Sequence, residues 1–474
     1  MNRHRSEQLR IDRDPKDISS LALVQDTEVI AQGLSSRDAV RMARLPMHFF
    51  ISAVALFGLG VSVIPLVVGD LVEFFYQPRI LATTHTFTLG WITSAIMGVM
   101  YRLVPAMTKR PIPFPRLARW QFGLYIFSAT GLIAHMLIGE WTPTWMAAAV
   151  IVLSVVLFAM NMWYCLAPGW NRRAAETGMC ISILFLLLAA TLGLLLALDK
   201  SGGFLSGNVL TNLASHAHLA ALGWVSLTIC AVSYRMAPAF LLSELTLPRV
   251  AIWQIYGLTA GVAGLAMALL GWIPGASIWS TVILLALLVY VGVLSTLIRK
   301  RRTPIDWTMR HALAGIICLL LAVALGFSLL WIDPDSALGN RVAGAYGVLG
   351  LLGWVTNLII GMSFKLFPGF VVGVRDRRGW PRLVIAELAL QRCRPLVFGL
   401  LNAGVLTLAG GLIMAQGPIA QFGGLILAVG GLIYVAVMGH TLSYAYRAAT
   451  PPTANGSPGL SSGDSRDQHG TTPE

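Results

Sequence analysis

Residues 85 to 105 read HTFTLGWITSAIMGVMYRLVP, and the chain repeats this stretch. Residues 218 to 238 read HLAALGWVSLTICAVSYRMAP, at a constant offset of 133 residues. A third copy, residues 352 to 368, reads LGWVTNLIIGMSFKLFP and follows the second at an offset of 130 residues. Each copy keeps a Gly-Trp pair, an aromatic residue followed by a basic one, and a proline, all in phase. A repeat of this length predicts three related structural units.

The rest of the chain consists mainly of apolar segments long enough to cross a bilayer. The 474 residues are 56% hydrophobic and 12% charged, with a mean hydropathy of +0.72, which is far more apolar than a soluble domain. A transmembrane helix needs about 20 apolar residues. We predict spans at 46–68, 79–105, 117–138, 145–167, 177–198, 209–238, 250–271, 277–298, 311–332, 342–368, 395–415 and 419–446. The predicted fold is an all-α membrane protein with about twelve transmembrane helices in three four-helix pseudo-repeats.

The net charge of +13 predicts an orientation in the membrane. Arginine and lysine gather in every second loop, while aspartate and glutamate dominate the others, so the positive-inside rule makes both termini cytoplasmic. We therefore expect a multi-pass protein of the cell (inner) membrane and no nucleic-acid partner. Residues 1–45 should form a cytoplasmic segment without a cleavable signal peptide, 46–446 the membrane domain, and 447–474 a disordered cytoplasmic tail.

Three of the nine histidines lie inside predicted spans near the outer boundary: His85, His216 and His218. Each lies several residues inside its predicted span, at about 1.5 Å per helical residue. An ionisable group at that depth is costly and indicates a function. Because His216 and His218 are two residues apart, they point to different neighbours, which disfavours one zinc ion and favours haem iron ligated from two helices. His135, near the outer end of the third span, fits either a functional or an interfacial role. The span histidines near the cytoplasmic ends are predicted to be ordinary interfacial residues: His48, His311 and His440.

At these residues the sequence resembles the catalytic-subunit superfamily of haem-copper oxidases, together with nitric-oxide reductases and the NnrS haem-copper family. The resemblance covers roughly 46–446, through about twelve spans, three arcs of four helices, and histidines near the outer ends of helices two and six. It implies cofactors at this outer depth. It also implies a His-x-His pair on the tenth helix and adjacent copper-binding histidines on the seventh. Here Tyr346 and Val348 stand in span ten, and span seven has no histidine.

We therefore predict a diverged member of the superfamily with a degenerate copper site. His85 and His218, which share one repeat position, are predicted to ligate one b-type haem, leaving His216 for a second ligand or a hydrogen bond. Arg79 and Arg341 are the candidate propionate partners, because arginine offers a planar fork to carboxylates. The expected role is electron transfer or a response to oxygen or nitric oxide, alongside other respiratory or cytochrome subunits in the lipid bilayer. Two alternatives remain: an active terminal oxidase or nitric-oxide reductase-like oxidoreductase that retains copper, and a membrane transporter.

Overall fold

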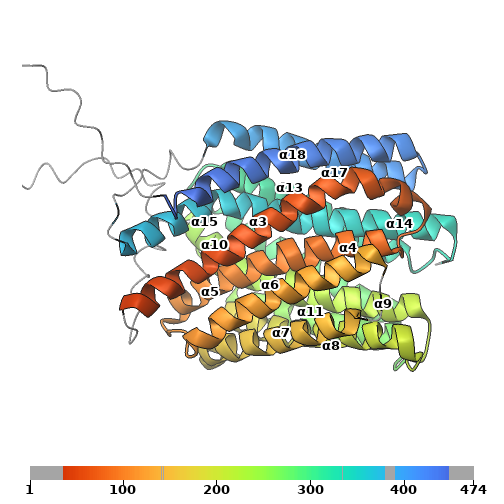
Figure 1. Ribbon diagram of the computed structural model, residues 1–474, viewed down its shortest axis with the longest axis horizontal. Coiled ribbons are helices and arrows are strands. Elements are labelled where there is room, and N and C mark those ends of the chain that lie inside the picture. Colours follow the sequence, from red (N-terminus) through yellow and green to blue (C-terminus); the bar gives the residue numbers. More distant parts are fainter. Residues whose placement is uncertain are drawn as a thin grey trace, which may run out of the picture.

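The computed structural model describes residues 36–447, except 140, 142, 334, 379 and 381–389. Within this part of the chain, twelve helices are long and apolar enough to cross a membrane, and no strand occurs. They run side by side along the long axis of the bundle (Figure 1). The predicted all-α fold with twelve spans is confirmed. Most of the predicted terminal segments, 1–35 and 448–474, lie outside the described residues.

Nine spans are single α-helices, and three are interrupted. The nine are α3 (Ser36–Glu73), α6 (Pro115–Ile138), α7 (Thr144–Leu166), α8 (Ala174–Gly202), α11 (Pro248–Leu269), α12 (Ala276–Arg299), α13 (Trp307–Ser328), α17 (Arg394–Ile413) and α18 (Gly417–Ser443). Short 3₁₀ turns, η2 (Ala167–Gly169) and η5 (Gln391–Cys393), follow α7 and precede α17. The second span is α4 (Pro78–His85), η1 (Thr86–Thr93) and α5 (Ser94–Thr108); the sixth is α9 (Val209–His218), η3 (Leu219–Ser226) and α10 (Leu227–Leu241); the tenth is α14 (Ala337–Val348), η4 (Leu349–Val355) and α15 (Thr356–Arg377).

Four predicted helix ends differ from the structure because proline does not stop a membrane helix here. The second and sixth spans continue past Pro105 and Pro238 to Thr108 and Leu241. The first helix begins at Ser36, upstream of the predicted start, and contains Pro46. The tenth span continues past Pro368 to Arg377, because the apolar residues that follow the proline remain buried. Neighbouring helices in a membrane bundle can satisfy the backbone groups that a proline frees.

The three spans that carry the repeated motif form the centre of the bundle. In their most apolar windows 83% of the second span, 72% of the tenth and 56% of the sixth are buried, whereas the other nine spans reach at most 50%. The outer helices expose large apolar side chains such as Leu66, Phe127 and Trp253, which suits a surface in contact with lipid. The structure is therefore that of a multi-pass membrane protein.

The repeated glycine allows the outer helices to approach the central spans closely. A Cβ atom added to Gly90 would lie 2.9 Å from Leu56, and one added to Gly223 would lie 2.6 Å from Phe185. The third copy behaves alike, since a Cβ atom on Gly353 would lie 2.8 Å from Cys318. Small residues at such crossings are the usual means of tight helix packing in membranes.

Each central span contains a π-helical segment, and the three segments begin at equivalent repeat positions, at residues 86, 219 and 349. Hydroxyl groups satisfy carbonyls within these segments: Ser226 donates to the Ala221 oxygen and Thr356 to the Leu351 oxygen, both at 2.9 Å. A π-helix widens the turn and is often found at functional sites. The repeat therefore encodes an irregularity at the same depth in all three copies.

The repeated tryptophans join the three central spans in a closed ring. Trp91 Nε1 donates to the Thr356 hydroxyl at 3.3 Å, Trp224 Nε1 to Thr93 at 3.1 Å, and Trp354 Nε1 to Ser226 at 3.3 Å. Each indole thus bonds to the hydroxyl of the preceding copy, in cyclic order. All three tryptophans are at most 2% exposed. The predicted pseudo-threefold arrangement is therefore realised by a specific set of hydrogen bonds, which we call the tryptophan ring.

Candidate functional site

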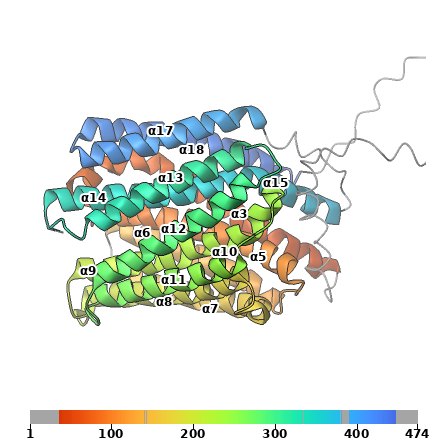
Figure 2. The same ribbon diagram turned by 180° about the vertical axis from the view of Figure 1, so that it is seen from behind.

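The three candidate histidines, His85, His216 and His218, lie at one end of the bundle, beyond the tryptophan ring. There α4, α9 and α14, the segments of the central spans beyond the tryptophan ring, pack mainly against the surrounding helices. The π-helical segments η1 and η3 instead both contact η4. The helices α4, α9 and α14 lie at the same end of the molecule in Figure 1, and α9 and α14 can be followed from behind in Figure 2. We call this end the histidine end.

His85 and His216 face each other across the junction between the second and sixth spans. Their ring centres are 6.4 Å apart and their ring planes differ by 22°. His85 Nδ1 lies 2.8 Å from the Leu81 carbonyl oxygen, and His216 Nδ1 lies 2.9 Å from that of Ala189. A carbonyl only accepts, so Nδ1 of each ring carries the proton and Nε2 keeps its lone pair. Both rings are therefore held in the tautomer that can ligate a metal through Nε2.

His216 is held in place by residues of the neighbouring helix α8. Ala189 and Gly193 lie one turn apart on α8, and the first accepts the hydrogen bond from His216. A Cβ atom on Gly193 would lie 2.9 Å from Cε1 of the His216 ring. Glycine at this position therefore makes room for the imidazole. Such outer contacts orient a ligand and tune its basicity.

His218 faces the tenth span, where its partner is Tyr346. The two ring centres are 6.0 Å apart, and the Tyr346 hydroxyl lies 3.3 Å from His218 Nε2. His218 Nδ1 donates to the Ala214 carbonyl oxygen at 2.7 Å, so Nε2 is unprotonated and accepts from the tyrosine. The ring that faces His85 is thus that of His216, and not that of His218 as the shared repeat position had suggested.

The cyclic symmetry explains this difference. Residues at one repeat position all point in the same rotational sense, so in a three-membered ring each faces a different position of the next copy. This is the heterologous contact of any closed ring. One position holds His85, His218 and Val348, and the position two residues earlier holds Thr83, His216 and Tyr346. His85 of the first copy therefore faces His216 of the second, and His218 of the second faces Tyr346 of the third.

The two predicted propionate partners differ in their surroundings. Arg79 is 65% exposed in its side chain and lies 3.9 Å from the Asp70 carboxylate, so it is already paired at the surface. Arg341, on α14, has a buried Nε atom that no described residue accepts from. An unpartnered buried donor of this kind is costly. Of the two arginines, Arg341 is therefore the better candidate to bind an anion inside the bundle.

The described residues offer no site with three converging metal ligands from His, Cys, Asp or Glu. His311, expected to be an ordinary interfacial residue, is instead completely buried, with Nδ1 2.9 Å from the Asn357 side-chain oxygen and Nε2 without a partner. It lies on α13, where the ring of Phe398 packs against it. The residues present therefore do not fit a three-histidine copper site, and we derive no step through copper.

The sequence analysis named Tyr346 without giving it a role at the site, and it did not single out Gly193. Tyr346 follows His216 at the repeat offset of 130 residues, so the repeat itself contained the signal that the two positions are equivalent. Gly193 lies in an apolar helix that contains other small residues and gave no signal of its own. Its importance depends on a contact with a different helix, which the repeat does not reveal.

No protein-family profile matches this chain. It is similar to one curated protein, the cbb3-type cytochrome c oxidase subunit CcoN1 of Stutzerimonas stutzeri, with 25% identity over 163 residues, which is 32% of this chain and 34% of that protein. The match therefore spans about a third of the curated relative. Among solved structures, a haem-copper terminal oxidase dimer determined by cryo-electron microscopy superposes with a TM-score of 0.63 at 11% identity, over 85% of this chain and 83% of that one. The resemblance suggested by the repeated motifs is confirmed in the architecture: this chain has the twelve-helix fold of a haem-copper terminal oxidase.

Proposed function

We propose that this protein binds one b-type haem through His85 and His216 and serves electron transfer in the membrane. The observation that carries the proposal is the facing pair of imidazoles, each with its Nδ1 proton engaged by a backbone carbonyl. This pairing replaces the one expected from the sequence, in which His218 was the second ligand. The similarity to oxidases supports haem as the type of cofactor but does not assign its ligands.

The separation of the two rings fits end-on ligation of one metal ion. Two imidazoles on opposite sides of a metal, with metal–nitrogen bonds of about 2 Å, have ring centres roughly 6 Å apart. The observed separation is 6.4 Å. The ring planes are also nearly parallel.

Ligation by two histidines favours electron transfer over gas binding. A haem bound here would supply a centre for one-electron oxidation and reduction. His85 and His216 would both hold the iron, whereas metal sites that bind a substrate keep one position open. The hydrogen bonds to Leu81 and Ala189 hold both rings in place, so neither is free to leave. We therefore prefer electron transfer to a response to oxygen or nitric oxide.

The transporter alternative conflicts with the centre of the bundle. Trp91, Trp224 and Trp354 are buried and bonded to one another's spans through the tryptophan ring. A carrier places its substrate site near mid-depth between related halves, but here the mid-depth axis is filled by three indoles. Opening it would break three hydrogen bonds at once.

Single alanine variants at His85, His216 and His218 test the proposal, with His440→Ala as the matched control at the opposite end of the bundle. The measurement is the haem content and spin state of purified protein, read from its optical spectrum. We expect six-coordinate low-spin haem in the parent, in His218→Ala and in His440→Ala. We expect its loss in His85→Ala and His216→Ala.

Three outcomes would contradict the proposal. Loss of low-spin haem in His218→Ala together with its retention in His216→Ala would restore the pairing predicted from the repeat position alone. Retention in all of the variants would move the site elsewhere. A parent protein that binds no haem when it is expressed with an ample haem supply would exclude the function itself.

A further inference from the structure

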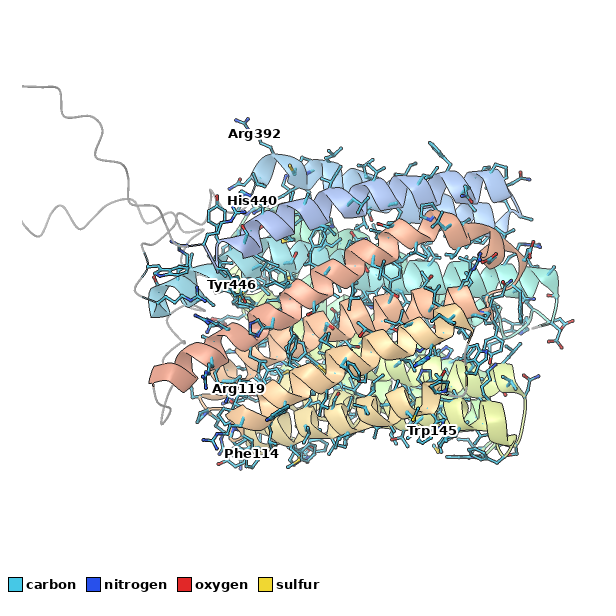
Figure 3. All side chains as sticks on the ribbon, in the orientation of Figure 1. Phe114, Arg119, Trp145, Arg392, His440 and Tyr446 are labelled. Carbon is cyan, nitrogen blue, oxygen red and sulfur yellow. The ribbon has the colours of Figure 1, made fainter. Side chains whose placement is uncertain are left out.

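The end of the bundle opposite the histidine end carries an unusual group of arginines. Arg44 lies near the start of α3, Arg375 near the end of α15, and Arg378 directly after it. Trp380 and Tyr446 complete the group, which we call the arginine cluster. Figure 3 shows Tyr446 at the same end of the molecule as the labelled arginines, and opposite Trp145.

The cluster brings positive charges together at a cost. Burial lowers the pKa of the Arg378 guanidinium, and the charges of Arg44 and Arg375 lower this pKa further. Arg378 is also held between aromatic rings, with its guanidinium carbon 4.4 Å from the centre of Trp380 and 5.6 Å from that of Tyr446. Two segments of the chain, the start of α3 and the end of α15, thus bring three guanidinium groups together.

Two of these arginines also have donors without acceptors. Nε of Arg44 and Nε of Arg378 are buried, and no described residue accepts a hydrogen bond from either. Arg375 differs, because it is 1% exposed and donates at 2.9 Å to the carbonyl oxygens of Tyr444 and Arg447, at the end of α18. It holds the last span in place and adds charge. The unsatisfied donors belong to Arg44 and Arg378.

We propose that the arginine cluster binds the headgroup of a phospholipid with a net negative charge, through its phosphate. A phosphate accepts forked hydrogen bonds from guanidinium groups and would relieve both the repulsion and the unpaired Nε donors. Lipid is the source that the position favours over free phosphate, because Arg44 lies at the first turn of a membrane span. Tyr446 and Trp380 are the residue types that gather at the headgroup level of a bilayer.

The expected selectivity follows from the number of charges involved. Each arginine near an anionic headgroup contributes about 1 kcal/mol, so two ligands favour an anionic lipid over a neutral one by about 30-fold. The aromatic contacts hold Arg378 in place before the lipid arrives. Arginines on the exposed loop after α12 lack both buried donors and aromatic partners, and they should show no such preference.

Native mass spectrometry of delipidated protein tests the inference, with phosphatidylglycerol and phosphatidylcholine added at equal concentrations. The parent should retain phosphatidylglycerol about 30-fold more tightly. Arg44→Gln and Arg378→Gln should each lose about fivefold of this preference, and the double variant nearly all of it. The matched control, Arg299→Gln with Arg301→Gln, removes the same charge from the same end of the bundle and should behave like the parent.

Thermal unfolding with inorganic phosphate separates the two sources of the anion. Phosphatidylglycerol should raise the melting temperature of the parent, and millimolar phosphate should not. Equal retention of the two lipids, an unchanged preference in both single variants, an equal loss in the control, or equal stabilisation by phosphate would each overturn the inference. The single variants decide the question if the double variant does not fold. The haem spectrum is a separate readout, so failure here leaves the proposed function untouched.

Discussion

Replacing Gly193 by alanine should weaken haem binding at the proposed site without changing either proposed ligand. The new Cβ atom would lie 2.9 Å from Cε1 and 3.3 Å from Nδ1 of the His216 ring, whereas carbon atoms in contact prefer about 3.5–4.0 Å. The ring must therefore move by roughly 0.7 Å. It is tied to Ala189 by a hydrogen bond of 2.9 Å, and a stretch of that size takes the bond past the useful limit. Loss of such a supporting contact typically weakens metal binding by about 10- to 100-fold.

The assay is a haem titration of purified Gly193→Ala protein, with spin state followed optically. We expect weaker binding and a shift from low-spin to high-spin haem as His216 leaves the axial position. Gly131→Ala is the control, because a Cβ atom on Gly131 meets no neighbour within 4 Å. Unchanged affinity and spin state in Gly193→Ala would refute the reasoning, as it would show that His216 is not held where the structure places it.

Two further predictions concern the bundle itself. Trp224→Phe should lower the free energy of unfolding by about 1–3 kcal/mol, because it leaves the buried Thr93 hydroxyl without its indole donor; Trp253→Phe, at a side chain 71% exposed, should change it little, and equal effects in a denaturant titration would contradict the role of the ring. Reporter fusions after Arg302 should be cytoplasmic and fusions after Asp335 external, and the opposite pattern would reverse the predicted orientation.

The overall fold was accessible from the sequence because its signals are local or periodic. Apolar length identifies a transmembrane span without knowledge of its neighbours. The three copies of the Gly-Trp motif, at 90–91, 223–224 and 353–354, also showed which helices are equivalent. They did not show the π-helical segments, because the same apolar residues suit an α-helix equally well. The hydrogen bonds that favour the π form depend on hydroxyl groups such as Ser226 and Thr356.

The pairing at the candidate site could not be read from equivalence alone. His85 and His218 share a repeat position, and this similarity suggested that they share a ligand. Facing across a threefold axis requires unlike positions, so the partner of His85 is His216. The direction of rotation around the axis decides the matter, and a one-dimensional sequence does not contain it.

The misjudged His311 has a similar cause. Its distance from the end of its helix suggested an interfacial residue, because depth was estimated along one helix only. The opposing tenth span presents Gly361, where an added Cβ atom would lie 2.7 Å from the His311 Cβ, and Asn357, which bonds the ring. Burial therefore depends on the neighbouring helix, which sequence periodicity does not describe.

The second, sixth and tenth spans meet in three equivalent junctions at the histidine end, and the side chains at these junctions differ. The first holds two imidazoles, the second an imidazole and a phenol, and the third the equivalent positions Val348 and Thr83, which have neither. Duplication of a four-helix unit would have produced three identical junctions, which substitutions could then alter independently. Two of the three equivalent junctions thus lack the pair of histidines that the first one has. Val348→His combined with Thr83→His would place two imidazoles at the third junction, as at the first, and Tyr346→His would do the same at the second.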